Sequence, residues 1–212
     1  MKSIRFPFAL AALTATTALV GCEATPTETP GVLDGLLADH TAHAASQSPA
    51  AAPPAHGAPD LAMIRAGSAP YRNETRAVAA GFVDVSGCVQ APPIPDFPYS
   101  GAMGHHYVNF DRLEEISVDP SRPEILLYIP NAQGRMELVG VEFAVNAEAW
   151  HAIHGAEVYP EVAGKSFDPP NPGADSPIVQ TSYTLHVWNW VENPDGMFVP
   201  FNPALSCPAA ED

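Results

Sequence analysis

The stretch PEILLYIPNAQGRMELVGVEFAV, residues 123–145, decides the fold of this chain. Its first apolar run, residues 124–129, is bounded by a proline on each side, and a second, longer run follows at residues 135–145. Between the two runs, Asn-Ala-Gln-Gly at residues 131–134 supplies the residues that tight turns favour. Two runs of strand length on either side of such a turn predict an antiparallel β-hairpin.

Shorter patterns on both sides of this hairpin predict the rest of the domain. Further strands are expected at residues 82–85, 105–108, 181–191 and 197–201, the last two joined as a second hairpin by Asn-Pro-Asp-Gly at 193–196. A helix is predicted over residues 71–80, and a second one follows the N-cap residue Asn146 and ends near His154. These elements predict an α+β fold, a compact and predominantly antiparallel β-sheet domain with two short helices.

The first 22 residues carry the pattern of an export signal. A cationic head at residues 1–5 precedes an uncharged apolar run at residues 6–20, which is too short for a stable membrane span. The run ends in Leu-Val-Gly-Cys, which resembles the bacterial lipobox. The resemblance implies that Cys22 is acylated and anchors the protein in the inner or the outer membrane of a bacterium, with the domain facing the periplasm or the cell exterior.

Composition divides the rest of the chain. After the signal peptide at residues 1–21, residues 22–70 begin with the lipidated Cys22 and are rich in Ala, Pro, Ser and Thr. Such residues bury too little apolar surface to offset the entropy of ordering, so this segment is predicted to be a disordered tether. A globular domain is predicted over residues 71–207, followed by a short tail at residues 208–212.

The net charge limits the kinds of binding partner, and the number of cysteines indicates the cellular compartment. Nine Lys and Arg against 24 Asp and Glu give the 212-residue chain a net charge of −15, which repels phosphate backbones and argues against nucleic-acid binding. With Cys22 acylated, Cys88 and Cys207 remain as an even pair in an oxidising compartment, and we expect a disulfide between them. A catalytic cysteine is disfavoured, because neither has an adjacent His or a Cys-x-x-Cys partner to activate its thiol.

Alternation along the strands predicts a candidate metal site. Because neighbours in a strand point to opposite faces, one consistent geometry places His106, His186 and Glu142 on the same face, with Glu124 as a further candidate. Two imidazoles and a carboxylate suit Zn²⁺, Cu²⁺ or Fe²⁺ and leave one coordination position for water or substrate. The alternative is that both histidines are buried, hydrogen-bonded strand residues, since no local spacing such as His-Glu-x-x-His supports a metal.

Aromatic residues on the same strands predict a second kind of site. We expect Trp188, Trp190 and Tyr128 to surround the candidate metal ligands. Together with Tyr107 they would form a cleft for a small apolar, cationic or sugar-like ligand. The alternative is that these side chains belong to the hydrophobic core.

Several motifs carry a resemblance to a family. They are GAMGHHYVN at residues 101–109, LHVWNW at 185–190, Asn-Pro-x-Gly-x-Phe at 193–198 and the Asn-Pro…Cys ending at 202–207. Together they resemble a widespread family of small uncharacterised secreted bacterial proteins, over about residues 75–207. The resemblance implies no particular activity, and it indicates His106 rather than His105 as the family histidine.

These patterns predict a membrane-anchored bacterial lipoprotein whose domain binds a small ligand or a metal ion. The alternative function is a metal-dependent enzyme that uses His106, His186 and Glu142 as ligands. Without a metal, Glu124 and Glu142 are the candidates for acid–base chemistry. The sequence contains no Gly-x-Ser-x-Gly nucleophile elbow and no glycine-rich phosphate loop.

Overall fold

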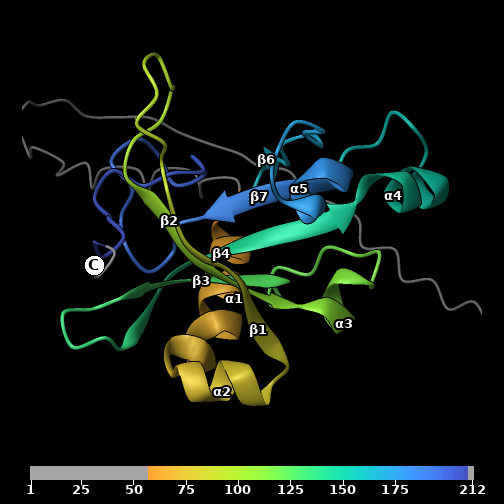
Figure 1. The fold of residues 1–212 in the computed structure, drawn as a ribbon. Helices are drawn as coiled ribbons and strands as arrows, with labels where there is room; N and C mark the ends of the chain where they lie inside the picture. The colour runs from red at the N-terminus through yellow and green to blue at the C-terminus, as the bar shows by residue number, and fades with distance from the viewer. Residues whose placement is uncertain (1–56, 210–212) are drawn as a thin grey trace, which may run out of the picture. The chain divides into compact units, whose positions relative to one another are not determined.

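Five antiparallel strands form the main sheet of the computed structural model, which describes residues 57–209 (Figure 1). The strands are β1 (Phe82–Gln90), β2 (Ala102–Asn109), β3 (Ile125–Pro130), β4 (Met136–Asn146) and β7 (Ser182–Val187), in the order β1-β2-β3-β4-β7. A small second sheet pairs β5 (Glu161–Val162) with β6 (Lys165–Ser166). The helices are α1 (Ala58–Ser68), η1 (Ala69–Arg72), α2 (Glu74–Ala79), α3 (Phe110–Leu113), α4 (Ala147–His154) and α5 (Pro177–Thr181). The predicted α+β class is confirmed.

The predicted central hairpin is formed by β3 and β4, within one residue of the expected bounds. Asn131 closes its turn, because the side-chain oxygen accepts hydrogen bonds of 3.0 Å from the backbone N–H groups of Gln133 and Arg135. β4 then ends at Asn146, which caps α4 by accepting a 3.0 Å hydrogen bond from Ala149 N–H. The hairpin and the cap are both confirmed.

The folded region begins earlier than the sequence predicted. Part of the expected tether forms α1, in which Ile64 is completely buried against the core of the sheet. Asp60 accepts a 2.8 Å hydrogen bond from the backbone N–H of Ala163, far along the chain. The predicted boundary at residue 71 is therefore wrong, because a helical apolar face outweighs the Ala- and Pro-rich composition. The predicted signal peptide, Cys22 and most of the tether lie outside the described residues.

The second predicted hairpin is wrong. β7 ends at Val187, and residues 197–201 form turns rather than a strand. Pro200, within that run, lacks the N–H group that a sheet ladder needs. Asn193 organises the return of the chain instead, donating a 2.9 Å hydrogen bond from its side chain to the Phe201 carbonyl.

The helix predicted over residues 71–80 is divided in two. η1 ends at Arg72 and α2 begins at Glu74, because Asn73 between them has the extended conformation, with φ −97° and ψ 108°. Among the described residues there are five α-helices rather than the expected two, although only α1 and α4 exceed seven residues.

Both faces of the main sheet are buried along β3, β4 and β7, whereas the edge strand β1 is mostly exposed. The larger core lies on one face and includes Tyr107, Leu126, Tyr128, Val141, Phe143 and Leu185, packed with Ile64 of α1 and Ala77 of α2. The smaller cluster lies on the other face and consists of Val108, Ile125, Leu127, Val139, Ala144 and Trp188, with Ile178 of α5 and Leu205 packed against it. A polar side chain in the buried part of β3, β4 or β7 is therefore withdrawn from water.

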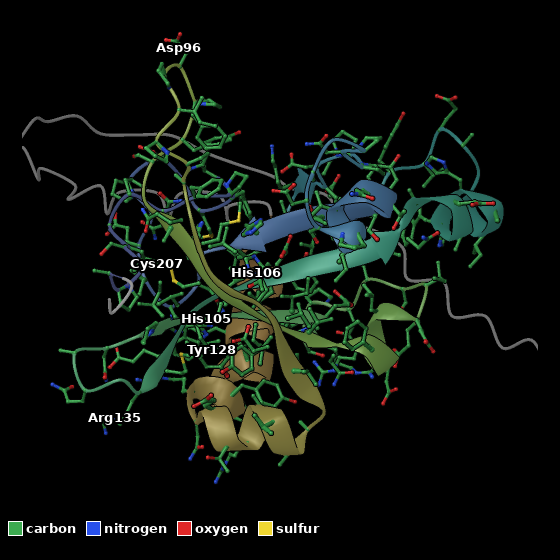
Figure 2. The ribbon with its side chains drawn as sticks, viewed as in Figure 1. Asp96, His105, His106, Tyr128, Arg135 and Cys207 are labelled. Carbon is green, nitrogen blue, oxygen red and sulfur yellow. A yellow bond between two sulfur atoms is a disulfide. The ribbon has the colours of Figure 1, made fainter. Side chains whose placement is uncertain are left out.

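The predicted disulfide joins Cys88 of β1 to Cys207, with 5.8 Å between their Cα atoms. It ties the edge strand of the sheet to the C-terminal segment, and Cys207 N–H also donates a 2.8 Å hydrogen bond to the side chain of Gln90. Figure 2 labels Cys207, and Asp96 at the tip of the loop that joins β1 to β2. Within residues 57–209, no helix combines the length and the apolar character that crossing a bilayer requires.

Candidate metal centre

Three side chains from three strands meet on the sheet face that carries the smaller apolar cluster. His106 lies on β2, Glu142 on β4 and His186 on β7. Glu142 and His186 are directly opposite each other across the β4–β7 pair. Because β3 lies between β2 and β4, the imidazole of His106 extends over Leu127, its partner on β3, to approach Glu142. The structure thus brings together the three ligand candidates of the sequence analysis.

The carboxylate of Glu142 lies between the two imidazoles. Its Oε2 is 3.7 Å from His106 Nε2, and its Oε1 is 3.7 Å from His186 Nδ1. One ligand atom from each residue can be chosen so that all three lie within 4.8 Å of one another. Bonds of about 2.0–2.1 Å to a tetrahedral zinc ion place neighbouring ligand atoms roughly 3.4 Å apart. The imidazoles of His106 and His186 therefore need to move only slightly toward the Glu142 carboxylate to reach the spacing of zinc ligands.

Gly140 makes room for an aromatic ring beside this cluster. It precedes Glu142 by two residues on β4, and a Cβ atom there would lie 3.1 Å from the Trp188 ring. The indole of Trp188 stacks on the imidazole of His186, with ring centroids 6.3 Å apart and an interplanar angle of 28°. Trp188 is only 3% exposed, so its ring shields His186 from water on this side.

Burial sets the protonation of the three groups. It raises the pKa of Glu142 to about 8, with smaller contributions from the negative charges of Glu124 and Asp168. It lowers the pKa of His106 to about 4 and that of His186 to about 3. At neutral pH the metal-free site therefore holds two neutral imidazoles and a protonated carboxyl group. Neutral imidazole is the form that binds a metal, so an ion needs to displace one proton only.

Two atoms of the cluster are buried without a hydrogen-bond partner in the described part of the chain, Glu142 Oε1 and His186 Nε2. Leaving a buried polar atom unsatisfied costs about 1–3 kcal/mol, and such an atom in a native fold calls for an explanation. A cation held by the carboxylate would satisfy Oε1. The two nitrogen donors and the carboxylate suit Zn²⁺, Cu²⁺ or Fe²⁺, so the residues present fit a divalent transition metal.

Ser86 contacts the site but was not predicted from the sequence. Its Oγ is 3.1 Å from His106 Nδ1 and accepts a 3.0 Å hydrogen bond from the backbone N–H of His106. Ser86 lies in a β-bulge, where the β1–β2 register shifts between Asp84 and Cys88. Alternation cannot place a bulged residue, and the only sequence signal is the glycine at position 87 inside a strand pattern.

Glu124, the further candidate, and His105, the neighbour of His106, supply no ligand atoms to the cluster. His105 is engaged elsewhere, with its Nδ1 2.8 Å from Asp84 Oδ2. Glu124 is 4% exposed and accepts a 3.1 Å hydrogen bond from Ala144 N–H. In its ionised form Glu124 raises the pKa of Glu142, which is its contribution to the site.

The predicted aromatic cleft is not formed. Tyr107 and Tyr128 pack against each other on the opposite face of the sheet, with ring centroids 4.7 Å apart, inside the larger core. Trp188 lies beside the metal-ligand candidates, whereas Trp190 lies beyond the end of β7 with the guanidinium of Arg65 4.2 Å from its ring centroid. The predicted position of Tyr128 was wrong because the register of β3 against β4 was not known. Alternation shows which residues of β3 share a face, but not which of its two faces lies on the same side of the sheet as Glu142.

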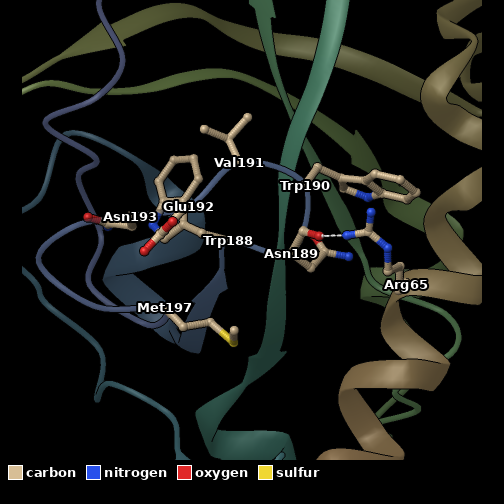
Figure 3. A pocket seen from close by; sticks show the side chains of 8 residues that line it. All are labelled: Arg65, Trp188, Asn189, Trp190, Val191, Glu192, Asn193 and Met197. Carbon is tan, nitrogen blue, oxygen red and sulfur yellow. Dashed lines mark hydrogen bonds between the residues drawn. The ribbon is translucent and has the colours of Figure 1, made fainter.

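A cavity of about 400 Å³ adjoins Trp188 at the end of β7 (Figure 3). It is lined by Arg65, Trp188, Asn189, Trp190, Val191, Glu192, Asn193 and Met197. Figure 3 shows Arg65 and Trp190 on one side, where Arg65 donates a hydrogen bond to the Asn189 carbonyl, and Glu192 and Asn193 on the other. None of the three metal-ligand candidates lines this cavity, so it is distinct from the candidate metal centre.

Comparison of the chain with protein-family models, with curated proteins and with solved structures found no match. The family resemblance of the motifs therefore stays an expectation, and the function has to be inferred from the chemistry of the site.

Proposed function

We propose that this domain binds a divalent transition-metal ion through His106, Glu142 and His186, as part of a lipoprotein held at a bacterial membrane. The observation that carries the proposal is the convergence of these three side chains from separate strands, two of them buried and that of His106 partly buried, with ligand atoms within 4.8 Å. Two supporting facts are the neutral state of both imidazoles at neutral pH and the buried Oε1 of Glu142, which has no hydrogen-bond partner in the described region.

The burial of the ligands favours retention of an ion over turnover. The side chain of Glu142 is 3% exposed and that of His186 is 6% exposed, and the Trp188 ring lies against His186. The second candidate function, a metal-dependent enzyme, is favoured by the count of three protein ligands, which leaves a coordination position for water or substrate. A substrate would first have to displace the side chains that cover the site.

Protein purified from the periplasmic side of the membrane without an affinity tag is expected to contain a stoichiometric divalent metal. His106→Ala and His186→Ala should each lose it, because two remaining ligands bind an ion weakly. Mass spectrometry of the metal content, normalised to protein, is the measurement. His154→Ala, which alters an exposed histidine of α4, is the matched control and should keep the metal. If the His106 and His186 variants retain the parent's metal, it is bound elsewhere.

The membrane anchor is proposed from the sequence around Cys22. The Cys88–Cys207 disulfide supports the export that this anchor requires, because disulfides persist in oxidising compartments. Acyl chains contribute about 0.8 kcal/mol per buried CH₂ group, so two or three chains hold a protein firmly. The net charge of −15 opposes binding to anionic lipid surfaces, which leaves the lipid on Cys22 as the means of attachment.

A Cys22→Ala variant is expected to move from the membrane fraction to the soluble fraction of lysed cells, because it has no thiol to acylate. Immunoblots of the two fractions, with the parent chain alongside, are the measurement. A variant that stays with the membranes after a high-salt wash would contradict the lipid anchor while leaving the metal site untouched.

A further inference from the structure

We propose that Ser86 is a positioning residue of the metal site, which orients the imidazole of His106 and fixes the tautomer that leaves Nε2 free to bind a metal. The inference rests on the proposed function in one respect, since the role of His106 as a ligand is itself proposed. The orientation and the tautomer of His106 are properties of the metal-free protein as well.

The hydrogen bonds around Ser86 Oγ assign the tautomer. The hydroxyl has one hydrogen, and its shortest contact is 2.7 Å to the carbonyl of Gly87, which can only accept. The same oxygen accepts from the backbone N–H of His106 at 3.0 Å, and its second lone pair faces His106 Nδ1 at 3.1 Å. All three contacts are satisfied together only if Nδ1 carries the proton. Nε2 then has a free lone pair, directed toward Glu142 at 3.7 Å.

The bulge that presents Ser86 is held by its own contacts. Asp84 Oδ1 accepts hydrogen bonds of 3.3 Å from the backbone N–H groups of Ser86 and Gly87, and Gly87 takes the left-handed φ of 62°. Asp84 Oδ2 in turn lies 2.8 Å from Nδ1 of His105. A series of contacts therefore links the two neighbouring histidines. His105 contacts Asp84, Asp84 accepts hydrogen bonds from the backbone of the bulge, and Ser86 in the bulge contacts His106.

The two imidazoles of the site differ in this respect. His186 Nε2 has no hydrogen-bond partner among residues 57–209, whereas His106 Nδ1 has Ser86. A partner on the second nitrogen of a metal-binding histidine fixes the ring orientation and the tautomer, and its removal typically lowers metal affinity by about 10- to 100-fold. His106 is also the ligand that extends across β3, so its ring depends most on such support.

The test compares the parent with Ser86→Ala, Ser86→Thr and the control Ser166→Ala, which alters an exposed serine of β6. Long-range proton–nitrogen NMR of the metal-free proteins reads the tautomer of His106, and competition with a chromophoric chelator measures the affinity for Zn²⁺. We expect Ser86→Ala to lose the pure Nδ1–H tautomer and to bind Zn²⁺ about 10- to 100-fold more weakly. Ser86→Thr, which keeps a hydroxyl, should restore both properties, and Ser166→Ala should match the parent.

The outcomes separate this inference from the proposed function. Ser86→Ala protein that keeps the Nδ1–H tautomer of His106, or binds Zn²⁺ within twofold of the parent, overturns the role of Ser86 while the metal site stands. A parent that binds none of Zn²⁺, Cu²⁺ and Fe²⁺ overturns the proposed function, and the tautomer measurement still decides whether Ser86 orients His106. Because Ser86 is exposed, its substitution by alanine leaves the core packing unchanged.

Discussion

A Cys88→Ser, Cys207→Ser double variant is expected to be less stable to unfolding than the parent by about 4–5 kcal/mol. The disulfide closes a loop with a sequence separation of 119 residues, which contains the end of β1 and every later strand, β2 to β7. In the chain-entropy account, a cross-link over so long a loop strongly restricts the unfolded chain. This loss matches the upper end of the range of about 2–5 kcal/mol that truncating a large core side chain costs.

Equilibrium denaturation in guanidinium chloride, followed by tryptophan fluorescence, measures this loss. Both cysteines are only partly buried, so serine in their place adds little cost of burying a hydroxyl group. Parent protein reduced with a dithiol is the matched control and should unfold at the midpoint of the double variant. A difference below about 1 kcal/mol between parent and double variant would contradict the entropic role of the cross-link.

The parts of the fold that were predicted correctly are those specified by neighbouring residues. The β3–β4 hairpin follows from two apolar runs around a turn that Asn131 closes through its own side chain. The cap of α4 is likewise a contact over three residues, from Ala149 N–H to Asn146. Local signals of this kind need no knowledge of the tertiary structure.

The errors in the fold concern segments whose structure depends on distant contacts. α1 has a composition typical of a linker, and it is held by the burial of Ile64 and by the hydrogen bond from Ala163 to Asp60. The segment after β7 follows a strand pattern, yet Asn193 bonds to Phe201 and turns the chain away from the sheet. Tertiary contacts override local propensity at both places.

The candidate site was predicted in part, and the reason lies in the pairing of the strands. Alternation places Glu142 and Val141 on opposite faces of β4, which is correct. It does not show which face of β3 is adjacent. In the structure Ile125 is the partner of Glu142, so Tyr128 falls on the other side of the sheet. Because β3 and β4 are buried on both faces, the polarity of their residues does not reveal the register of the two strands either.

Metal binding is expected to stabilise this protein more strongly as the pH rises from about 6 to about 8. Burial raises the pKa of Glu142 to about 8, so a metal that takes its carboxylate must displace a proton throughout this range. Each pH unit below that pKa therefore weakens binding by roughly tenfold, which corresponds to about 1.4 kcal/mol. Both imidazoles are already neutral, because the pKa values of His106 and His186 are about 4 and about 3.

The metal-free protein should show the opposite slope over the same range. The pKa of Glu142 is raised from 4.5 to about 8 on folding, so protonation of this group adds to the free energy of unfolding. That contribution is fully present below pH 4.5 and is lost as the pH rises through 8. Glu124, whose burial also raises its pKa to about 8, adds a contribution of the same sign. The two histidines act on the acid side, where their lowered pKa values destabilise the fold as the pH falls below 6.5.

Thermal unfolding with excess EDTA and with excess Zn²⁺, at about pH 6, 7 and 8, measures both slopes at once. The midpoints in the two solutions should separate further at each higher pH, since the metal-free form loses stability while the metal affinity increases. Glu142→Gln is the matched control, because it is isosteric and uncharged at every pH. It should keep the fold, lose most of the stabilisation by Zn²⁺ and retain only the slope that Glu124 contributes. A parent whose midpoints stay equally far apart from pH 6 to pH 8 would show that the ion does not displace the Glu142 proton.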